Sequence, residues 1–100
     1  MNYKVILLPS AVQDIIEAHE WYEEKTPGLG EKFQSEISKR INIIKQHPDR
    51  FPVRKKPYRE CPINKYPYLI VYSFDESGKE VIISAVFHTK RNSKKKYKKS

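Results

Sequence analysis

The sequence predicts an α+β domain in which one helical hairpin packs on a mostly antiparallel sheet. Two observations support this fold class: apolar residues recur with the helical period over residues 10–47, and they alternate with the period of a strand after residue 66. The predicted order along the chain is β-α-α-β-β-β. A chain of 100 residues can build one core, so we expect residues 1–100 to form a single domain that ends in a basic tail at 90–100.

The first strand and helix follow from local signals. The segment YKVILL at 3–8 is short, apolar and ended by a proline, which is typical of a buried strand. Ser10 is expected to cap the first helix, with Gln13 completing a capping box. The helix should end near Thr26, because the next residue is a proline. Its apolar face is predicted from residues at helical spacing: Val12, Ile15, Ile16, His19 and Tyr22.

The second helix begins after the glycine corner GLG at 28–30 and should end at His47, which precedes a proline. One stripe of this helix is apolar: Leu29, Phe33, Ile37, Ile41 and Ile44. The short link between the helices predicts an antiparallel hairpin.

The remaining segments predict strands. Residues 51–63 contain three prolines, so a strand there must be interrupted or lie at a sheet edge. The segment YPYLIVYSF at 66–74 alternates as a strand does, DESGK at 75–79 is a hairpin loop, and EVIISAVFH at 80–88 is the return strand. Both strands of this hairpin are apolar on both faces. We therefore expect that both faces are covered, or that one face awaits a partner.

Charge is distributed unevenly along the chain. Residues 1–50 carry seven Lys or Arg and eight Asp or Glu, a balance of −1, whereas residues 51–100 carry thirteen and four, a balance of +9. Such a basic half is typical of a protein with an anionic target, namely nucleic acid, a ribosome or an acidic protein, although a charged face can also simply be solvated. We interpret the single cysteine, Cys61, as a small core residue, and a chain without a disulfide suits the cytoplasm. No apolar segment is long enough to span a membrane.

The motifs of many enzyme classes are missing, including a dinucleotide fingerprint, a P-loop and paired His/Cys clusters, so we expect no cofactor and no metal. The candidate site residues are cationic, phenolic or imidazole groups: Arg54, Lys56, Arg59, His88, Lys90, Arg91 and Tyr97. Such groups could cleave a phosphodiester without a metal, through a base, an acid and fixed positive charge on the phosphorane. A plain nucleic-acid-binding surface uses the same residue types, and both readings stay open.

Four segments in order resemble the RelE/ParE family of bacterial toxins: WYEEKTPGLGEKF at 21–33, HPDRFP at 47–52, YREC followed by YPYLIVY at 58–72, and AVFHTKR at 85–91. The resemblance covers nearly the whole chain, and the predicted β-α-α-β-β-β order is that family's fold. It implies the toxin half of a type II toxin–antitoxin module, a class often described as plasmid stabilisation proteins. It also implies a cognate antitoxin that is encoded beside the toxin and wraps it with an extended or helical segment.

The family divides by target, since RelE-like members cleave mRNA on the ribosome and ParE-like members poison DNA gyrase. Arg91 and Tyr97 match the spacing of the RelE-type catalytic arginine and tyrosine, and Lys90 also fits. Leu69, however, stands where RelE has an arginine, and YPYLIVY is closer to the ParE pattern. The resemblance thus implies gyrase poisoning ahead of ribosome-dependent mRNA cleavage.

Within the nuclease reading, His88, Arg91 and Tyr97 would be catalytic. Arg54, Lys56, Arg59, Lys90 and Arg91 would bind the target, and the lysines after Arg91 would be an electrostatic handle. The alternative is a non-catalytic basic module that binds RNA or ribosomes.

Overall fold

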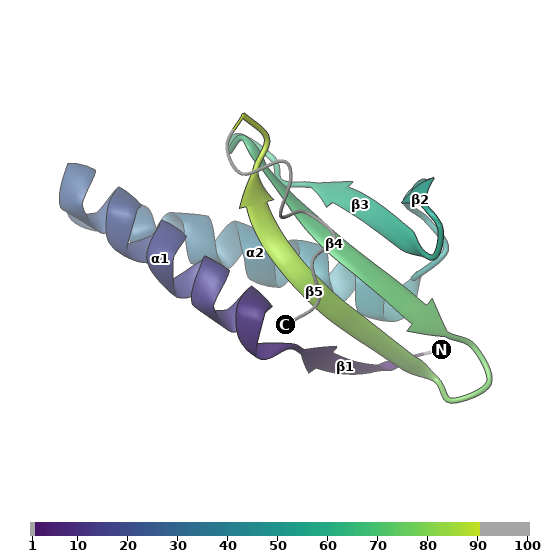
Figure 1. The fold of residues 1–100 in the computed structure, drawn as a ribbon. Helices are drawn as coiled ribbons and strands as arrows, with labels where there is room; N and C mark the ends of the chain where they lie inside the picture. The colour runs from purple at the N-terminus through teal and green to yellow at the C-terminus, as the bar shows by residue number, and fades with distance from the viewer. Residues whose placement is uncertain (1, 91–100) are drawn as a thin grey trace.

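The computed structural model describes residues 2–90 and places the secondary structure in two layers, with both helices on one side of the sheet (Figure 1). The helical layer is an antiparallel hairpin of two helices, α1 (Pro9–Lys25) and α2 (Leu29–Gln46). The sheet contains five strands: β1 (Lys4–Leu7), β2 (Val53–Lys55), β3 (Tyr58–Pro62), β4 (Tyr68–Asp75) and β5 (Glu80–His88).

The sheet is mostly antiparallel, as predicted. Its strand order is β1-β5-β4-β3-β2, in which β1 runs parallel to β5 and every other neighbouring pair is antiparallel. The predicted strand count was one short. The proline-rich segment folds into two strands, β2 and β3, because Pro57 lies in a turn between them and a proline cannot donate to the ladder. The observed order is therefore β-α-α-β-β-β-β.

The start of α1 differs from the prediction, whereas the helix ends agree with it. The N-cap is Leu8, which makes no side-chain cap bond, and Pro9 is the first helical residue, a position that suits the fixed φ of proline. Ser10 lies inside the helix and its hydroxyl donates to the Ser84 carbonyl at 2.7 Å. The predicted capping box was therefore wrong. The caps at the other ends, Thr26 for α1 and His47 for α2, are those predicted.

A carboxylate fixes the corner between the helices. The Glu23 side chain accepts hydrogen bonds from the backbone amides of Gly28, at 2.8 Å, and Gly30, at 2.9 Å. Gly28 adopts a φ of +89°, which favours glycine, and a Cβ on Gly30 would meet the His19 carbonyl oxygen at 2.6 Å. The glycine corner thus permits both the turn and the close approach of the helices.

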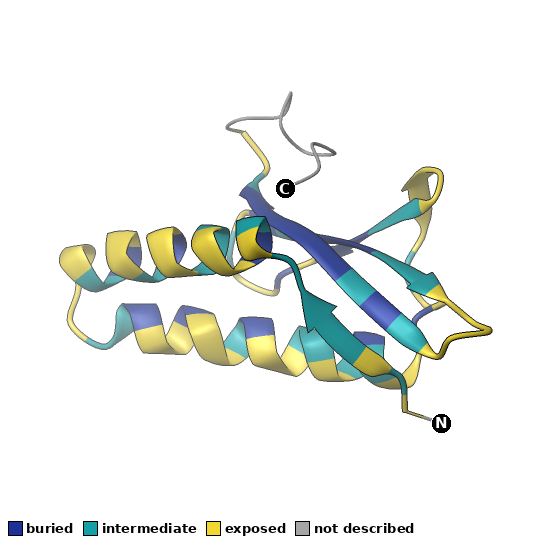
Figure 2. Ribbon diagram, turned by 60° about the horizontal axis from the view of Figure 1, so that its bottom comes forward, coloured by how far each residue is buried: buried dark blue, intermediate teal, exposed yellow. Residues whose placement is uncertain are grey.

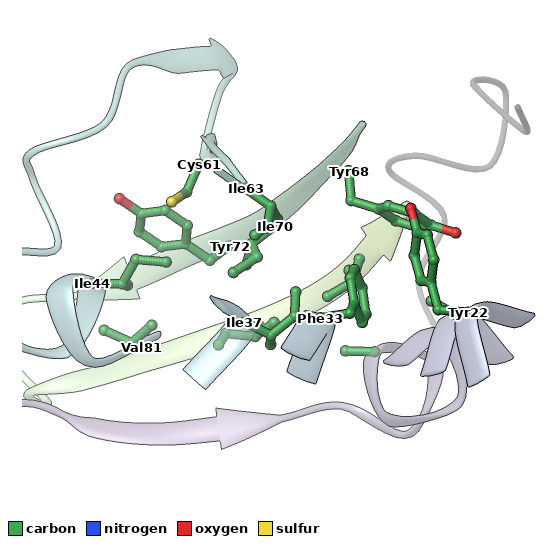
Figure 3. Packing of buried hydrophobic residues seen from close by; sticks show 14 residues of the cluster. Tyr22, Phe33, Ile37, Ile44, Cys61, Ile63, Tyr68, Ile70, Tyr72 and Val81 are labelled. Carbon is green, nitrogen blue, oxygen red and sulfur yellow. The ribbon is translucent and has the colours of Figure 1, made fainter. Parts of the chain in front are cut away.

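The main core lies between the helices and the sheet and is rich in aromatic and β-branched side chains (Figure 3). A second, smaller cluster contains Val71, Ala85 and Phe87, with Tyr58 and Leu69 packed against it. Its β4 members alternate with residues of the main core, so it lies on the face of the sheet opposite the helices. Both faces of the β4–β5 hairpin are therefore apolar and largely buried, in line with the two-faced sequence pattern (Figure 2).

Within residues 2–90, neither helix combines the length and the apolar character that crossing a bilayer requires.

Candidate target-binding surface

The sequence-predicted site residues fall into three groups. Arg91 and Tyr97 lie outside the described residues. His88 and Lys90 lie at the end of β5, whereas the third group, Arg54, Lys56 and Arg59, belongs to β2, β3 and the turn between them.

His88 is held by its neighbours at the end of β5. Its ring meets the Tyr68 ring edge-on, with centroids 5.2 Å apart. Its Nδ1 accepts a hydrogen bond from the backbone amide of Lys90 at 3.1 Å, so a neutral imidazole in this geometry carries its proton on Nε2. The chain is tied down here as well, because the Thr89 amide donates to the Pro67 carbonyl at 2.8 Å. The Lys90 side chain is exposed.

Arg54 and Lys56 lie on the opposite edge of the sheet. All three residues of β2 are exposed (Figure 2), and the exposed Lys56 follows directly, so this edge of the sheet carries cationic residues that are accessible to solvent. A short, irregular and charged strand is also a common way to protect a sheet edge from pairing with another chain.

Arg59 has a structural role that is visible in its contacts. Its guanidinium Nη1 donates to the carbonyl oxygens of Phe51, at 2.6 Å, and Asp49, at 3.2 Å. The same group lies 5.3 Å from the centroid of the Phe74 ring. Beside it, the buried Tyr72 hydroxyl donates to the Pro48 carbonyl at 2.6 Å. Together these bonds anchor the loop that follows α2.

The two described groups of cations are far apart. His88 pairs with Tyr68 on β4, and Arg59 pairs with Tyr72, four residues further along the same strand. Arg59 is thus displaced from His88 by four residues along the strand direction, about 13 Å, and by two strand spacings across the sheet, about 10 Å. Together these displacements separate the two backbone positions by roughly 16 Å. The pairing of the strands therefore does not bring His88 and Arg59 together around one phosphate.

Leu69 follows Tyr68, the residue that pairs with His88, and its side chain lies on the other face of the sheet from that of Tyr68. It pairs with Phe87 and packs against the cluster on the helix-free face. Leucine carries no charge, so this position of β4 supplies no contact to a phosphate.

Two polar residues of α1, Ser10 and Asp14, bind β5 through contacts that the sequence did not predict. β1 pairs with β5 only as far as Leu7. After Leu7, side chains of α1 bond to the backbone of β5 instead. The Ser10 hydroxyl donates to the Ser84 carbonyl, and the Asp14 carboxylate accepts a hydrogen bond from the Val86 amide at 3.0 Å, so these side chains take the place of a neighbouring strand along this edge of β5. The burial that these contacts require raises the pKa of Asp14.

Other titratable groups do not suit a nucleophile or a metal site. Burial raises the pKa of the Cys61 thiol to about 11, and burial likewise raises that of Tyr72 to about 12. Among residues 2–90, no three His, Cys, Asp or Glu side chains are grouped so that they could hold a metal ion. A cavity of about 260 Å³ lies near the start of β1, and the predicted site residues are not among those that line it.

A family model described as the ParE toxin of the type II toxin–antitoxin system parDE matches residues 5–93. The chain belongs to the ParE toxin family. The structure of the chromosomal ParDE toxin–antitoxin system from P. aeruginosa superposes on this ParE-family chain with a TM-score of 0.75 and 16% identity, covering 86% of this chain and 95% of that one.

Two further solved structures share the fold of this ParE-family chain. The free E. coli toxin RelE, in a form with two arginines replaced by alanine, gives a TM-score of 0.70 and 15% identity over 92% of this chain and 88% of that one. The RelBE2 toxin–antitoxin complex of Mycobacterium tuberculosis gives a TM-score of 0.61 and 17% identity, covering 88% of this chain and 99% of that one. A comparison with curated protein sequences found no relative.

Proposed function

We propose that this chain is the toxin of a type II toxin–antitoxin module, that it arrests growth from the cytoplasm, and that a cognate antitoxin neutralises it. The match of the ParE toxin model to residues 5–93 is the observation that carries this proposal. Two of the similar structures are toxin–antitoxin systems, which supports an antitoxin as the partner.

We place DNA gyrase ahead of the ribosome as the target. A metal-independent nuclease needs a base, an acid and fixed positive charge around one phosphate. Among the described residues, Arg59 is hydrogen-bonded to backbone carbonyls. His88 lies roughly 16 Å from Arg59, as estimated from the pairing of β3, β4 and β5, and Leu69 is apolar. Poisoning an enzyme by binding to it requires no such arrangement, so these observations favour the ParE-type activity.

Ribosome-dependent mRNA cleavage is the second candidate. It is favoured by His88 and Lys90 at the end of β5, directly before Arg91. With Nδ1 engaged by the Lys90 amide, His88 presents Nε2–H, which would donate a hydrogen bond to an oxygen of the phosphorane and stabilise its charge. Arg91 would then stabilise the phosphorane and Tyr97 would assist it. A non-catalytic module that binds RNA or ribosomes is the remaining alternative.

The toxin assignment is tested by inducing the chain in a host and following growth. We expect arrest, and we expect growth to resume when the reading frame adjacent to the gene is co-expressed. A host that grows normally, with the protein present and folded, would contradict the assignment.

The target is tested with purified protein and Arg91→Ala in two parallel assays, gyrase supercoiling and mRNA cleavage on translating ribosomes. We expect the wild-type chain to inhibit supercoiling, and we expect both the wild-type chain and Arg91→Ala to leave mRNA intact. Ribosome-dependent cuts that vanish in Arg91→Ala would instead make the chain a nuclease. Truncation after Arg91 tests the electrostatic handle, because loss of the lysines beyond it should weaken binding to an anionic target and flatten its salt dependence.

A further inference from the structure

The outer side of β2 is an open edge of the sheet. β2 comes last in the order β1-β5-β4-β3-β2, so no strand of residues 2–90 lies beyond it, and Figure 1 shows it at the rim of the sheet, away from α1. All three of its residues are exposed, and the Val53 side chain is 47% exposed. The opposite side of the sheet differs, because there Ser10 and Asp14 of α1 bond to the backbone of β5.

The backbone of Val53 points toward this open edge. Val53 pairs with Arg59, and the Glu60 amide donates to the Pro52 carbonyl at 3.3 Å. In an antiparallel ladder this pattern makes Val53 and Arg59 a non-hydrogen-bonded pair, so the bonds to β3 come from the residues on either side of Val53. The amide and the carbonyl of Val53 are therefore directed away from β3, where an added strand would meet them.

The segment that contains β2 is strongly cationic. Residues 50–59 include five Lys or Arg and no Asp or Glu. Arg59 is held by loop carbonyls, but three of the other cations are exposed: Arg50, Arg54 and Lys56. The carboxylates that flank the segment are those of Asp49, which is exposed, and Glu60, which is buried. This edge therefore carries a local excess of positive charge.

Charge and proline restrict what the edge can pair with. A second copy of β2 would place cation against cation, and like charges directly opposite each other on paired strands are destabilising, whereas opposite charges are stabilising. Pro52 and Pro57 have no amide hydrogen, which limits an added strand to about four residues, or about 13 Å, opposite residues 53–56. The edge thus disfavours pairing with another copy of itself and selects a short strand that carries carboxylates.

We propose that the open edge of β2 binds an extended acidic segment of a partner protein, which adds to the sheet as a short strand. Strand addition of this kind takes its affinity from main-chain hydrogen bonds and its specificity from side chains. Here Val53 supplies the main-chain groups and an apolar contact, and the exposed cations meet the carboxylates of the segment. The inference deepens the proposed function and rests on it only in taking the antitoxin as the protein that supplies the segment.

The test follows the Val53 amide by NMR in the full chain during titration with an eight-residue peptide of alternating Glu and Val. The control probe is the same peptide with N-methyl groups on alternate residues, which keeps the charge but blocks strand pairing. We expect the unmodified peptide to shift the Val53 amide resonance and to slow its hydrogen exchange. We also expect it to bind at least about five-fold more tightly than the methylated peptide, as the loss of one backbone hydrogen bond implies.

Val53→Pro is the decisive variant. It removes the amide hydrogen that points to the open edge, and proline is tolerated at such positions of an edge strand, so the ladder with β3 is retained. We expect this variant to show a cooperative thermal transition and to bind the unmodified peptide at least about five-fold more weakly, as followed at the Arg54 amide. Val53→Thr keeps the amide and a β-branched side chain and should bind within about two-fold of wild type.

Charge is tested separately with Arg54→Gln and Lys56→Gln. Each should weaken binding of the unmodified peptide by about two- to five-fold at low salt, the range for one exposed ion pair, and by less at high salt. The matched control is Lys32→Gln, an exposed lysine of α2, which should leave binding unchanged.

Equal affinity of wild type and Val53→Pro for the unmodified peptide overturns the proposal, as does equal affinity of wild type for the two peptides. Absence of peptide binding at millimolar concentration overturns it too, and binding of a single-stranded oligonucleotide instead would make this edge a nucleic-acid surface.

A second ligand, the product of the adjacent reading frame, separates this inference from the proposed function. If that product relieves growth arrest but binds Val53→Pro as tightly as wild type, this inference alone is contradicted. If the peptide binds as expected but the chain does not arrest growth, the proposed function alone is contradicted.

Discussion

Replacing Arg59 with methionine should destabilise the fold by about 2 kcal/mol. A hydrogen bond from a charged donor contributes about 1.5–3 kcal/mol. Arg59 makes a half-buried bond to the Phe51 carbonyl, whereas its bond to the Asp49 carbonyl is exposed and water can replace it. Its cation–π contact with Phe74 at 5.3 Å adds about 0.5 kcal/mol. Methionine keeps most of the apolar stem, so the loss reports on the charged head.

Urea unfolding is the assay, with Arg54→Met as the matched control. For a domain of this size, a change of about 2 kcal/mol moves the midpoint by about 1 M. Arg54 lies on the exposed β2 strand, so its replacement should change stability by less than about 0.5 kcal/mol. If both variants unfold at the wild-type midpoint, Arg59 does not anchor the loop after α2. A stable Arg59→Met protein that no longer arrests growth would instead make Arg59 a target contact.

Three further predictions concern stability and reactivity. Tyr72→Phe should cost about 1–2 kcal/mol in urea unfolding, because it leaves the buried Pro48 carbonyl without its donor at 2.6 Å; an unchanged midpoint would contradict this. The hydrogen bond from the Gly28 amide lowers the pKa of Glu23 in the folded protein below its unfolded-state pKa of 4.5. The ionised Glu23 carboxylate therefore stabilises the fold above pH 4.5, and this stabilisation is lost as the pH falls through the lower pKa of the folded state. Glu23→Gln should therefore unfold with a weaker pH dependence in that acidic range, and a profile parallel to wild type would refute the link. Burial raises the pKa of Cys61 to about 11, so iodoacetamide at pH 8 should modify it far more slowly in the native than in the urea-unfolded protein; equal rates would show that the thiol is accessible.

Local and periodic signals predicted the layers of the fold, because they reflect short-range chemistry. The proline after Thr26 and the proline after His47 set the helix ends. Alternation identified β4, and the hairpin loop after it identified β5 as the return strand. The same reasoning failed at Ser10. A capping box and an interior serine look alike in sequence, and the structure uses this hydroxyl on a carbonyl 74 residues away.

The candidate site was harder to predict for the same physical reason. Residue type and order identified the cations, but not their partners. Arg59 bonds to loop carbonyls, and the distance between His88 and Arg59 depends on the pairing of three strands. The predictions for Arg91 and Tyr97 lie outside the described residues.

The most direct test of the central claim is a gyrase supercoiling assay with the purified chain titrated against the enzyme. We predict that supercoiling falls as the toxin is added, that it recovers when the product of the adjacent reading frame is added in equal amount, and that mRNA on translating ribosomes stays intact at the same concentrations. If expression of the chain arrests growth but the purified chain leaves supercoiling complete at every concentration, the ParE-type activity is contradicted. Ribosome-dependent mRNA cleavage would then be the remaining toxin activity to test.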